Sequence, residues 1–407
     1  MKRGLTSQRP PPPRLRSWFT RGRILMAIVL LLIVVLLSLF QLHVLEGVSM
    51  APAFADGQWL LVRRDSSPPQ RYEAIVMRSS GSEVKTVIKR AIAFGGESIL
   101  IRDGDALIDG KPMLRSDRQI RSTLVPYLRL ADLDLRGRGR RRSLVGRNDL
   151  EMVLPLKGRC ELSAGGDFLK FEAGDDGAVA RIPAMSFKDD HLSPKGRWRP
   201  GTEIVQDIVL TLKIYEVDYG GSLELAQILD GKAAWSLALE RRHSGWHLSL
   251  RDENGALFYE VLRDHSLENL IRVHAIDQTL RLEAALDAKG REWSELFRQE
   301  LSRPSSRRES WLRLSVVGAP RLILARLEID RDIHYTSQQT DAAYGVRASF
   351  EVPRGQVFVL GDNSPESRDS RHWGALEIAE NVVGRPVFSI WPRERWGRVT
   401  SNPENSR

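Results

Sequence analysis

Ser49 lies in a short segment that could present a nucleophile. The segment Glu46–Pro52 reads EGVSMAP and comes directly after a long apolar run. A serine hydroxyl is a weak nucleophile and needs a neighbouring base, for which a histidine serving a G-x-S-x-G elbow is the familiar case. Ala51 stands where the second glycine of that elbow belongs, and Pro52 interrupts the helix that the elbow requires after its serine. The segment therefore holds a nucleophile with a different base, or it is a flexible linker.

Lysine is the alternative base, provided that burial lowers the pKa of its amine. The segment Val84–Phe94, VKTVIKRAIAF, is rich in β-branched residues and predicts a strand. Alternation places Lys89 on the same face as Ala91 and Ala93, small apolar residues that would desolvate the amine and leave room for a partner. The same pattern also fits an edge-strand lysine whose amine reaches solvent. The pattern permits a catalytic role without showing it.

A third polar segment lies near the C-terminus. Gly361–Gly374 reads GDNSPESRDSRHWG and is dense in Asp, Asn, Ser and Arg, which form turns and charge-assisted hydrogen bonds. Taken alone, it predicts a structured turn. Asp362 and Asn363 suggest a cation site, but no second acidic cluster offers the further oxygen ligands. The single cysteine, Cys160, excludes an internal disulfide. We expect no metal and no organic cofactor.

The apolar run predicts a membrane anchor over residues 24–45. About 22 helical residues span roughly 33 Å, enough for the hydrocarbon core. The run is longer than the apolar region of a cleavable signal peptide, and HVLEGVSM contains no small-x-small cleavage site. The preceding tail, residues 1–23, is basic and favours a cytoplasmic N-terminus, with the chain beyond the anchor on the far side. Its basic residues are Lys2, Arg3, Arg9, Arg14, Arg16, Arg21 and Arg23.

Together these segments resemble the bacterial type I signal peptidases, which are membrane-bound proteases with a Ser/Lys dyad. That family carries an S-M-x-P box after its anchor, a K-R pair on a later strand, and a G-D-N-x-x-x-S-x-D-S-R-x-x-G box. The corresponding residues here are Ser49–Pro52, Lys89-Arg90 and Gly361–Gly374, in the same order. Two positions differ, because Gly95-Gly96-Glu97 replaces the family's P-G-D and Ser364 replaces the arginine usual after G-D-N.

By this resemblance Ser49 is the nucleophile and Lys89 the general base. The oxyanion hole would use the Ser49 backbone N–H, and Gly47 stands where some relatives add a hydroxyl. Ser367 would orient the lysine amine. The other implied supporting residues are Asp369 and Arg371 as an ion pair, with Asp362 and Asn363 shaping the loop. The residues expected to bind the substrate as an added strand are Gly47, Val48, Met50, Val87 and Ile88.

The resemblance implies an endopeptidase that removes signal peptides from exported preproteins at the outer face of the bacterial cytoplasmic membrane. The implied partners are preproteins and the lipid bilayer. An alternative is a membrane-tethered binding protein that uses a protease-like scaffold. A self-cleaving Ser/Lys protein of the repressor type is a third interpretation, disfavoured by the anchor and by the lack of a DNA-binding module. The basic block Arg136–Arg142 lacks interleaved aromatics and is interpreted as a solvated loop, so no nucleic-acid partner is expected.

The protease-like sequence is interrupted by a long insertion. We expect a mainly β chain, with a catalytic domain over 46–112 and 335–400, a charged insertion segment over 113–200, and an antiparallel β-sandwich over 201–334. The sandwich resembles a laminin-G or concanavalin jelly roll and would bind a protein or a glycan. The alternating residues that predict its core are Ile208, Leu210, Leu212, Ile214, Trp246, Leu248, Leu250, Leu312, Leu314, Val316, Leu322, Leu324, Leu327 and Ile329. We expect Gly201–Asp332 to fold alone and to be dispensable for cleavage of a short peptide.

Overall fold

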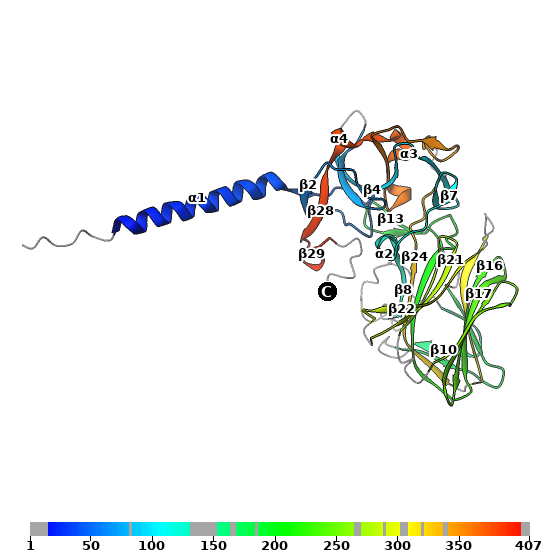
Figure 1. Cartoon of the computed structure of the whole chain (residues 1–407). Helices are drawn as coiled ribbons and strands as arrows, with labels where there is room; N and C mark the ends of the chain where they lie inside the picture. The colour runs from blue at the N-terminus through cyan, green and yellow to red at the C-terminus, as the bar shows by residue number, and fades with distance from the viewer. Residues whose placement is uncertain are drawn as a thin grey trace, which may run out of the picture.

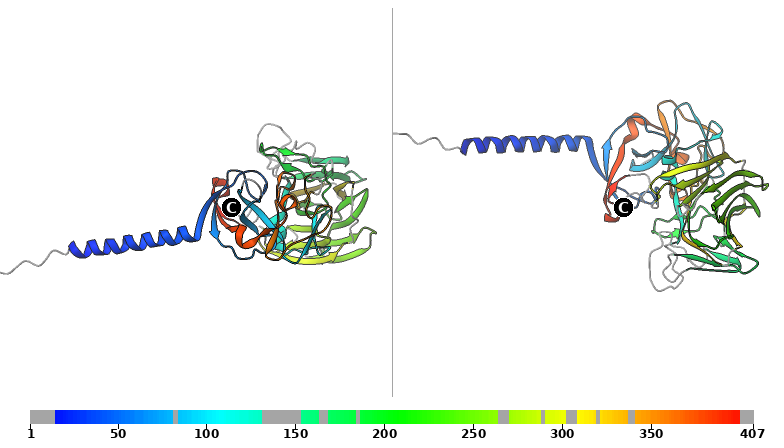
Figure 2. Two further views of the ribbon diagram at one scale, coloured as in Figure 1. Left: turned by 90° about the horizontal axis from the view of Figure 1, so that it is seen from above. Right: turned by 60° about the horizontal axis from the view of Figure 1, so that its bottom comes forward.

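The chain is described by a computed structural model and is mainly β, as predicted (Figure 1). The described residues are 15–80, 84–130, 153–162, 168–183, 186–263, 270–287, 290–301, 308–318, 321–336 and 341–399. The basic block Arg136–Arg142 and the first fourteen residues of the basic tail lie outside them. Figures 1 and 2 show one long helix projecting from a body of two β-rich units.

The long helix, α1 (Leu15–Leu39), ends before the predicted anchor does. The next residues form β1 (Phe40–Val44), which pairs antiparallel with β2 (Trp59–Arg64). The prediction of one helix over 24–45 is therefore wrong beyond Leu39, because the edge of β2 satisfies the backbone of this apolar stretch as a strand. In the part of the chain that the structure describes, no helix combines the length and apolarity needed to cross a membrane.

The first β-rich unit contains an antiparallel sheet in the order β1-β2-β28-β3-β4-β26-β27, with β29 paired to β28. The remaining strands of this sheet are β3 (Ala74–Arg78), β4 (Thr86–Phe94), β26 (Gln356–Leu360), β27 (Leu376–Glu377), β28 (Val382–Trp391) and β29 (Gly397–Arg398). β4 lies within the predicted strand Val84–Phe94 and confirms it. Its residues from Ile88 to Ala93 are buried, because β3 and β26 flank it and apolar residues cover both faces.

A smaller sheet completes this unit in the order β25-β5-β6-β7. Its strands are β5 (Ser98–Arg102), β6 (Asp105–Ile108), β7 (Lys111–Pro112) and β25 (Phe350–Glu351). Ile99 and Ile108 of this sheet share one core cluster with Ile92 of β4 and Phe358 of β26. The short helices that come after β26 are η3 (Ser364–Glu366), α3 (Ser370–Trp373), α4 (Ile378–Asn381) and η4 (Arg393–Arg395).

The second unit is a sandwich of two antiparallel sheets around one core (Figure 1). One sheet contains β8 (Val125–Arg129), β10 (Arg159–Leu162), β11 (Leu169–Glu172), β15 (Ile208–Val217), β20 (Ile271–Ile276), β21 (Thr279–Ala285), β22 (Trp293–Glu300) and β24 (Arg321–Arg331). The other contains β9 (Leu154–Lys157), β12 (Ala178–Ile182), β16 (Ser222–Leu229), β17 (Lys232–Arg242), β18 (Gly245–Asp252), β19 (Leu257–Arg263) and β23 (Ser310–Val317). All fourteen alternating residues predicted to form the core belong to it. The phase break between Leu324 and Leu327 coincides with a register shift opposite Ile214.

The sandwich includes strands from before residue 201, where the sequence placed the start of the sandwich. Strands from the stretch 113–200 lie in both sheets, β8 and β11 in one and β9 and β12 in the other. The same stretch supplies helix α2 (Asp117–Thr123), whose Ile120 packs against Val209 and Ile276 of the sandwich. It also supplies a two-stranded hairpin, β13 (His191–Leu192) and β14 (Trp198–Arg199). The charged segment is therefore built into the sandwich.

Candidate active site

Ser49 lies in a tight turn whose flanking side chains are buried. The Ala51 N–H donates to the Val48 carbonyl at 3.0 Å. Val48 and Met50 are buried, and Met50 packs in a core cluster with Leu60 of β2. Two buried neighbours fix the direction of the serine between them, so this segment is a structured turn and the flexible-linker alternative does not describe it.

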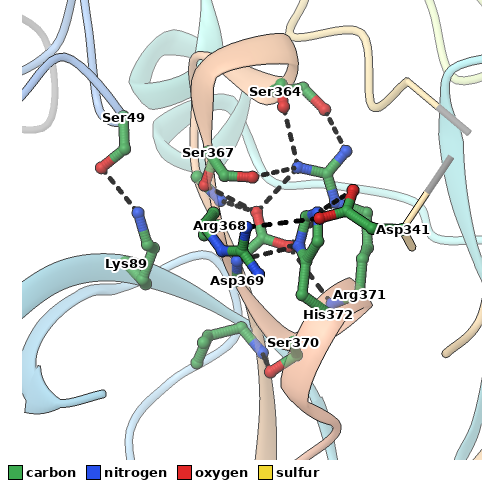
Figure 3. Close-up of polar contacts among 12 residues, drawn as sticks. Ser49, Lys89, Asp341, Ser364, Ser367, Arg368, Asp369, Ser370, Arg371 and His372 are labelled. Carbon is green, nitrogen blue, oxygen red and sulfur yellow. Dashed lines mark hydrogen bonds and ion pairs between the residues drawn. The ribbon is translucent and has the colours of Figure 1, made fainter. Parts of the chain in front are cut away.

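Lys89 of β4 reaches the serine across the site. Its Nζ lies 2.6 Å from the Ser49 Oγ, as Figure 3 shows. The lysine is 2% exposed, and burial lowers the pKa of its amine from 10.5 to about 8. The nearby Asp369 carboxylate opposes this shift, and the Arg371 guanidinium adds to it. A substantial fraction of the amine is therefore neutral in mildly alkaline solution and able to accept a proton.

Asp369 and Arg371 form a fully buried ion pair beside the lysine (Figure 3). The Arg371 Nε donates to Asp369 Oδ1 and the Arg371 Nη2 donates to Asp369 Oδ2, both at 2.8 Å. Burial raises the pKa of the Asp369 carboxyl, but Arg371 and the hydrogen bonds to the carboxylate outweigh burial, and the pKa lies below its usual value. The carboxylate is thus ionised when the lysine titrates.

Ser367 contacts this ion pair. Its hydroxyl donates to Asp369 Oδ2 at 2.7 Å, whereas Ser367 and Lys89, both described residues, share no hydrogen bond. A carboxylate is the stronger acceptor for a hydroxyl proton, which accounts for this orientation. The expected direct orientation of the lysine amine by Ser367 is not seen.

Gly361 allows this loop to approach Ser49. A Cβ built at Gly361 would lie 2.2 Å from the Ser367 Oγ and 2.6 Å from the Ser49 carbonyl oxygen. The adjoining Asn363 donates its backbone N–H to the same Ser49 carbonyl at 3.0 Å. Any larger residue at position 361 would push the loop and the serine turn apart.

Arg90 is a structural residue of the site whose partners the sequence did not predict. It lies on the opposite face of β4 from Lys89, is fully buried, and donates its Nε to Asp362 Oδ1 at 2.8 Å. Its terminal nitrogens donate to the carbonyls of Tyr72 at 2.8 Å and Ser122 at 2.9 Å. An arginine alternating with apolar residues in the predicted strand Val84–Phe94 was the available signal, because an arginine buried in such a strand needs a partner for its charge.

The structure gives both departures from the family boxes a local role. The Ser364 hydroxyl accepts from the Thr336 N–H at 2.9 Å and from Arg371 at 2.7 Å. The Glu97 carboxylate accepts from the Phe94 N–H at 2.8 Å and also binds Arg71. Ser364 and Glu97 therefore both form hydrogen bonds that stabilise the loops in which they lie.

The predicted substrate-binding residues line two adjacent segments. Val87 and Ile88 pair with Met77 and Val76 of β3 on one side of β4. On the other side, the ladder between β4 and β26 ends at the pair Arg90 and Leu360. β26 therefore does not pair with the backbone of Val87 or Ile88. Met50 is a core residue, so its side chain is not available to a substrate.

One carboxylate cluster among the described residues has the proximity that a metal ion requires. Asp105, Asp207 and Asp277 place ligand oxygens within 4.8 Å of one another, and the group includes neither Ser49 nor Lys89. Arg115 donates to both oxygens of Asp277 at 2.7 Å, so a cation already compensates part of this charge. The absence of a metal at Ser49 and Lys89 stays a prediction.

The site thus combines a hydroxyl with a buried amine of lowered pKa on a β frame, the arrangement of a nucleophile and its general base. The family described as "Signal peptidase, peptidase S26" matches residues 16–132 and 297–391, more than half of the chain. The chain belongs to this signal peptidase family.

Individual relatives match over short stretches. Thylakoidal processing peptidase 1 of Arabidopsis thaliana is 63% identical over 41 residues, which are 10% of this chain and 12% of the relative. Probable signal peptidase I-1 of Synechocystis is 48% identical over 50 residues, 12% of this chain and 25% of the relative. Signal peptidase I of Streptococcus pneumoniae is 40% identical over 57 residues, which are 14% of this chain and 28% of the relative. The chain therefore spans about a quarter or less of most of these relatives, which come from a plant and from bacteria.

The solved structures match weakly. The CBM2 module of the Lactobacillus casei phage J-1 evolved Dit has a TM-score of 0.36 at 11% identity and covers 53% of this chain and 99% of its own. The VIP36 exoplasmic/lumenal domain has a TM-score of 0.31 at 10% identity, and the match covers 44% of this chain and 82% of that domain. At these scores the likeness supports no conclusion about the ligand of the sandwich.

Proposed function

We propose that this protein is a membrane-associated serine endopeptidase that removes signal peptides from exported preproteins. Ser49 is the nucleophile and Lys89 the general base. The observation that carries the proposal is the 2.6 Å contact between the Ser49 Oγ and a buried lysine amine whose pKa is lowered to about 8. Membership of the signal peptidase family supports the substrate class.

The proposed reaction proceeds through an ester on Ser49. The Ser49 Oγ attacks the scissile carbonyl carbon, and its proton passes to the Lys89 Nζ. When the tetrahedral intermediate collapses, Lys89 returns that proton to the leaving amine, and the signal peptide remains esterified to the serine. Lys89 then takes a proton from water as the oxygen of that water attacks the ester carbonyl carbon. When the bond to Ser49 Oγ breaks, Lys89 returns this proton to the Oγ, and the signal peptide leaves as a carboxylic acid. No step requires a cofactor.

The substrate is proposed to add as a strand beside β4. The backbone edge of Val87 and Ile88 that β26 does not pair lies on the strand that carries Lys89, so a peptide paired there would pass the dyad. Gly47 and Val48 border the opposite side of the same route. Small residues next to the scissile bond fit this route because buried side chains surround Ser49.

The protein is proposed to work on a bilayer at the outer face of the cytoplasmic membrane. The apolar side chains of α1 from Ile24 to Leu39 are exposed. At its end, Trp59 of β2 pairs with Trp391 of β28, and both are exposed, as is the nearby Trp396. Figure 1 shows β2 and β28 at the foot of α1. Tryptophans prefer the membrane–water interface, so lipid would cover both the helix and this surface.

We further propose that residues 46–112 and 335–400 form the catalytic unit and that the sandwich is an insert within it. The division is supported because the sandwich has its own core cluster, while Val125 of β8 and Trp198 pack in the cluster of the catalytic unit where the two units meet. The insertion was expected from residue 113 and its sandwich from residue 201; the pairing of β8 with β24 supports a sandwich that begins earlier, at β8.

The test is cleavage of a preprotein by the full chain in detergent. Ser49→Ala and Lys89→Ala should each reduce turnover by at least about 10³-fold, because nucleophile and base act as a unit. Lys89→Arg should be equally inactive, since guanidinium stays protonated. The exposed Lys85→Ala is the matched control and should cleave normally. Near wild-type turnover by Lys89→Ala would refute the dyad.

A further inference from the structure

A hydrogen-bonded amide connects the insert to the nucleophile. Asn363 is 4% exposed, and its Nδ2 donates to the Val48 carbonyl at 2.9 Å and to the Leu192 carbonyl at 2.7 Å. Its backbone N–H donates to the Ser49 carbonyl at 3.0 Å. Val48 and Ser49 belong to the catalytic unit, whereas Leu192 belongs to the inserted hairpin. Both protons of the amide are therefore used, one on each unit.

The hairpin that supplies the Leu192 carbonyl is held firmly at its base. It comprises residues 189–201, with Leu192 paired to Trp198. The Gly201 N–H donates to Asp190 Oδ1 at 2.6 Å, and Arg331 of the sandwich strand β24 donates to the Asp190 carbonyl at 2.6 Å. The hairpin position is thus set by the sandwich.

The same hairpin packs onto the catalytic unit. Trp198 packs against the core cluster that contains Ile92 of β4 and Phe358 of β26. His191 lies 3.7 Å from Glu366 of η3, in the loop that carries Asn363. Figure 1 places β13 beside the catalytic sheet. The hairpin therefore contacts both the core of the catalytic unit and the loop that carries Asn363, and these contacts restrict where the hairpin carbonyls can lie.

We propose that the inserted hairpin is a positioning element for the nucleophile, acting from Leu192 through Asn363 on the Val48–Ser49 turn. This inference rests on the proposed function of Ser49. The Asn363 side-chain amide donates both of its protons, so its orientation is fixed. The hydrogen bond to the Leu192 carbonyl holds the amide in the orientation that also reaches the Val48 carbonyl. Without that carbonyl the amide is free to rotate away from Val48, and the serine turn loses a restraint. Displacing a reacting group by about 1 Å costs on the order of 10²-fold in rate.

The inference reverses the expectation that Gly201–Asp332 is dispensable. That deletion removes Arg331 and Gly201, which hold the base of the hairpin. The insert is then part of the catalytic apparatus, even though it has its own core.

The test removes the hairpin alone. Asp190–Pro200 is replaced by Gly-Gly, which the structure allows because a Cβ on Gly201 would lie 2.0 Å from Asp189 Oδ1, so the two ends already meet. The full chain in detergent is assayed on a short signal-peptide substrate. We expect kcat to fall on the order of 10²-fold with KM within about twofold. Lys195→Ala, at the exposed hairpin tip, is the control and should match the wild type.

A second variant separates positioning from general stability. Asn363→Asp keeps the side-chain shape but cannot donate, so kcat should fall by a similar factor. Combining it with the hairpin replacement should lower kcat no further than the more damaging change alone, because both act through one amide. Additive losses would overturn the inference. If the hairpin replacement does not fold, Trp198→Ala takes its place in the same cycle, with a smaller loss of kcat expected.

The outcomes distinguish the two proposals. A folded hairpin replacement with wild-type kcat would overturn the positioning role and leave the function of Ser49 intact. Activity that survives in Ser49→Ala would overturn the proposed function and, with it, this inference.

Discussion

Replacing Lys89 by methionine should stabilise the folded protein while abolishing cleavage. Burial lowers the pKa of the Lys89 amine from 10.5 to about 8. Since a difference of one in pKa between folded and unfolded states corresponds to about 1.4 kcal/mol, the protonated amine destabilises the fold by about 3 kcal/mol. Methionine has similar length and no charge, but loses the hydrogen bond to Ser49, worth about 1 kcal/mol. We expect a net gain of about 2 kcal/mol in the free energy of unfolding at pH 7.

The pH dependence of this gain tests its origin. Below pH 8 the lysine is protonated in both states, so the full cost of burying its charge is present. Between pH 8 and 10.5 the folded protein has released the proton that the unfolded chain still binds, so wild-type stability rises with pH. Above pH 10.5 the amine is neutral in both states. The advantage of Lys89→Met should therefore be largest at pH 7 and disappear near pH 10.5.

The assay is urea unfolding in detergent at pH 7, 9 and 10.5, followed by tryptophan fluorescence. Lys111→Met, on the exposed strand β7, is the matched control and should change the free energy of unfolding by less than about 0.5 kcal/mol. A destabilised Lys89→Met, or a gain that does not shrink as the pH rises, would refute the reasoning that the lysine is a buried, desolvated charge.

Other consequences can be measured separately. With Lys89 as base, kcat/KM should rise with pH and level off above about 8; a profile that is flat from pH 6 to 9 would contradict this. Arg90→Leu should destabilise by about 3–5 kcal/mol in urea by leaving the Asp362 charge buried, and Arg90→Leu combined with Asp362→Asn should recover part of the loss. Leu314→Ala should cost about 2–5 kcal/mol in the sandwich core, and a neutral result would exclude its burial.

Much of the fold could be predicted because strand burial has a period of two along the chain. Ile208, Leu210 and Leu212 alternate toward one face, and each lies in the sandwich core. The charged stretch 113–200 was not recognised as part of the sandwich, because its strands are short and lie between segments without periodicity. Phe40–Val44 continues an apolar run and was predicted to be helical. It is a strand because β2, which comes after the serine turn, offers an edge to pair with.

For the site, the residue types alone indicated which groups were available. The identity and order of Ser49, Lys89 and the Gly361–Gly374 segment resemble the boxes of the signal peptidases, and this resemblance implied a nucleophile, a base and a supporting loop. The fold was needed to show that the amine lies 2.6 Å from the hydroxyl and is buried enough to lose its proton near pH 8. The fold also joined Leu192 to Asn363, residues 171 positions apart. Contact and desolvation arise only when distant strands pack together, so no local pattern records them.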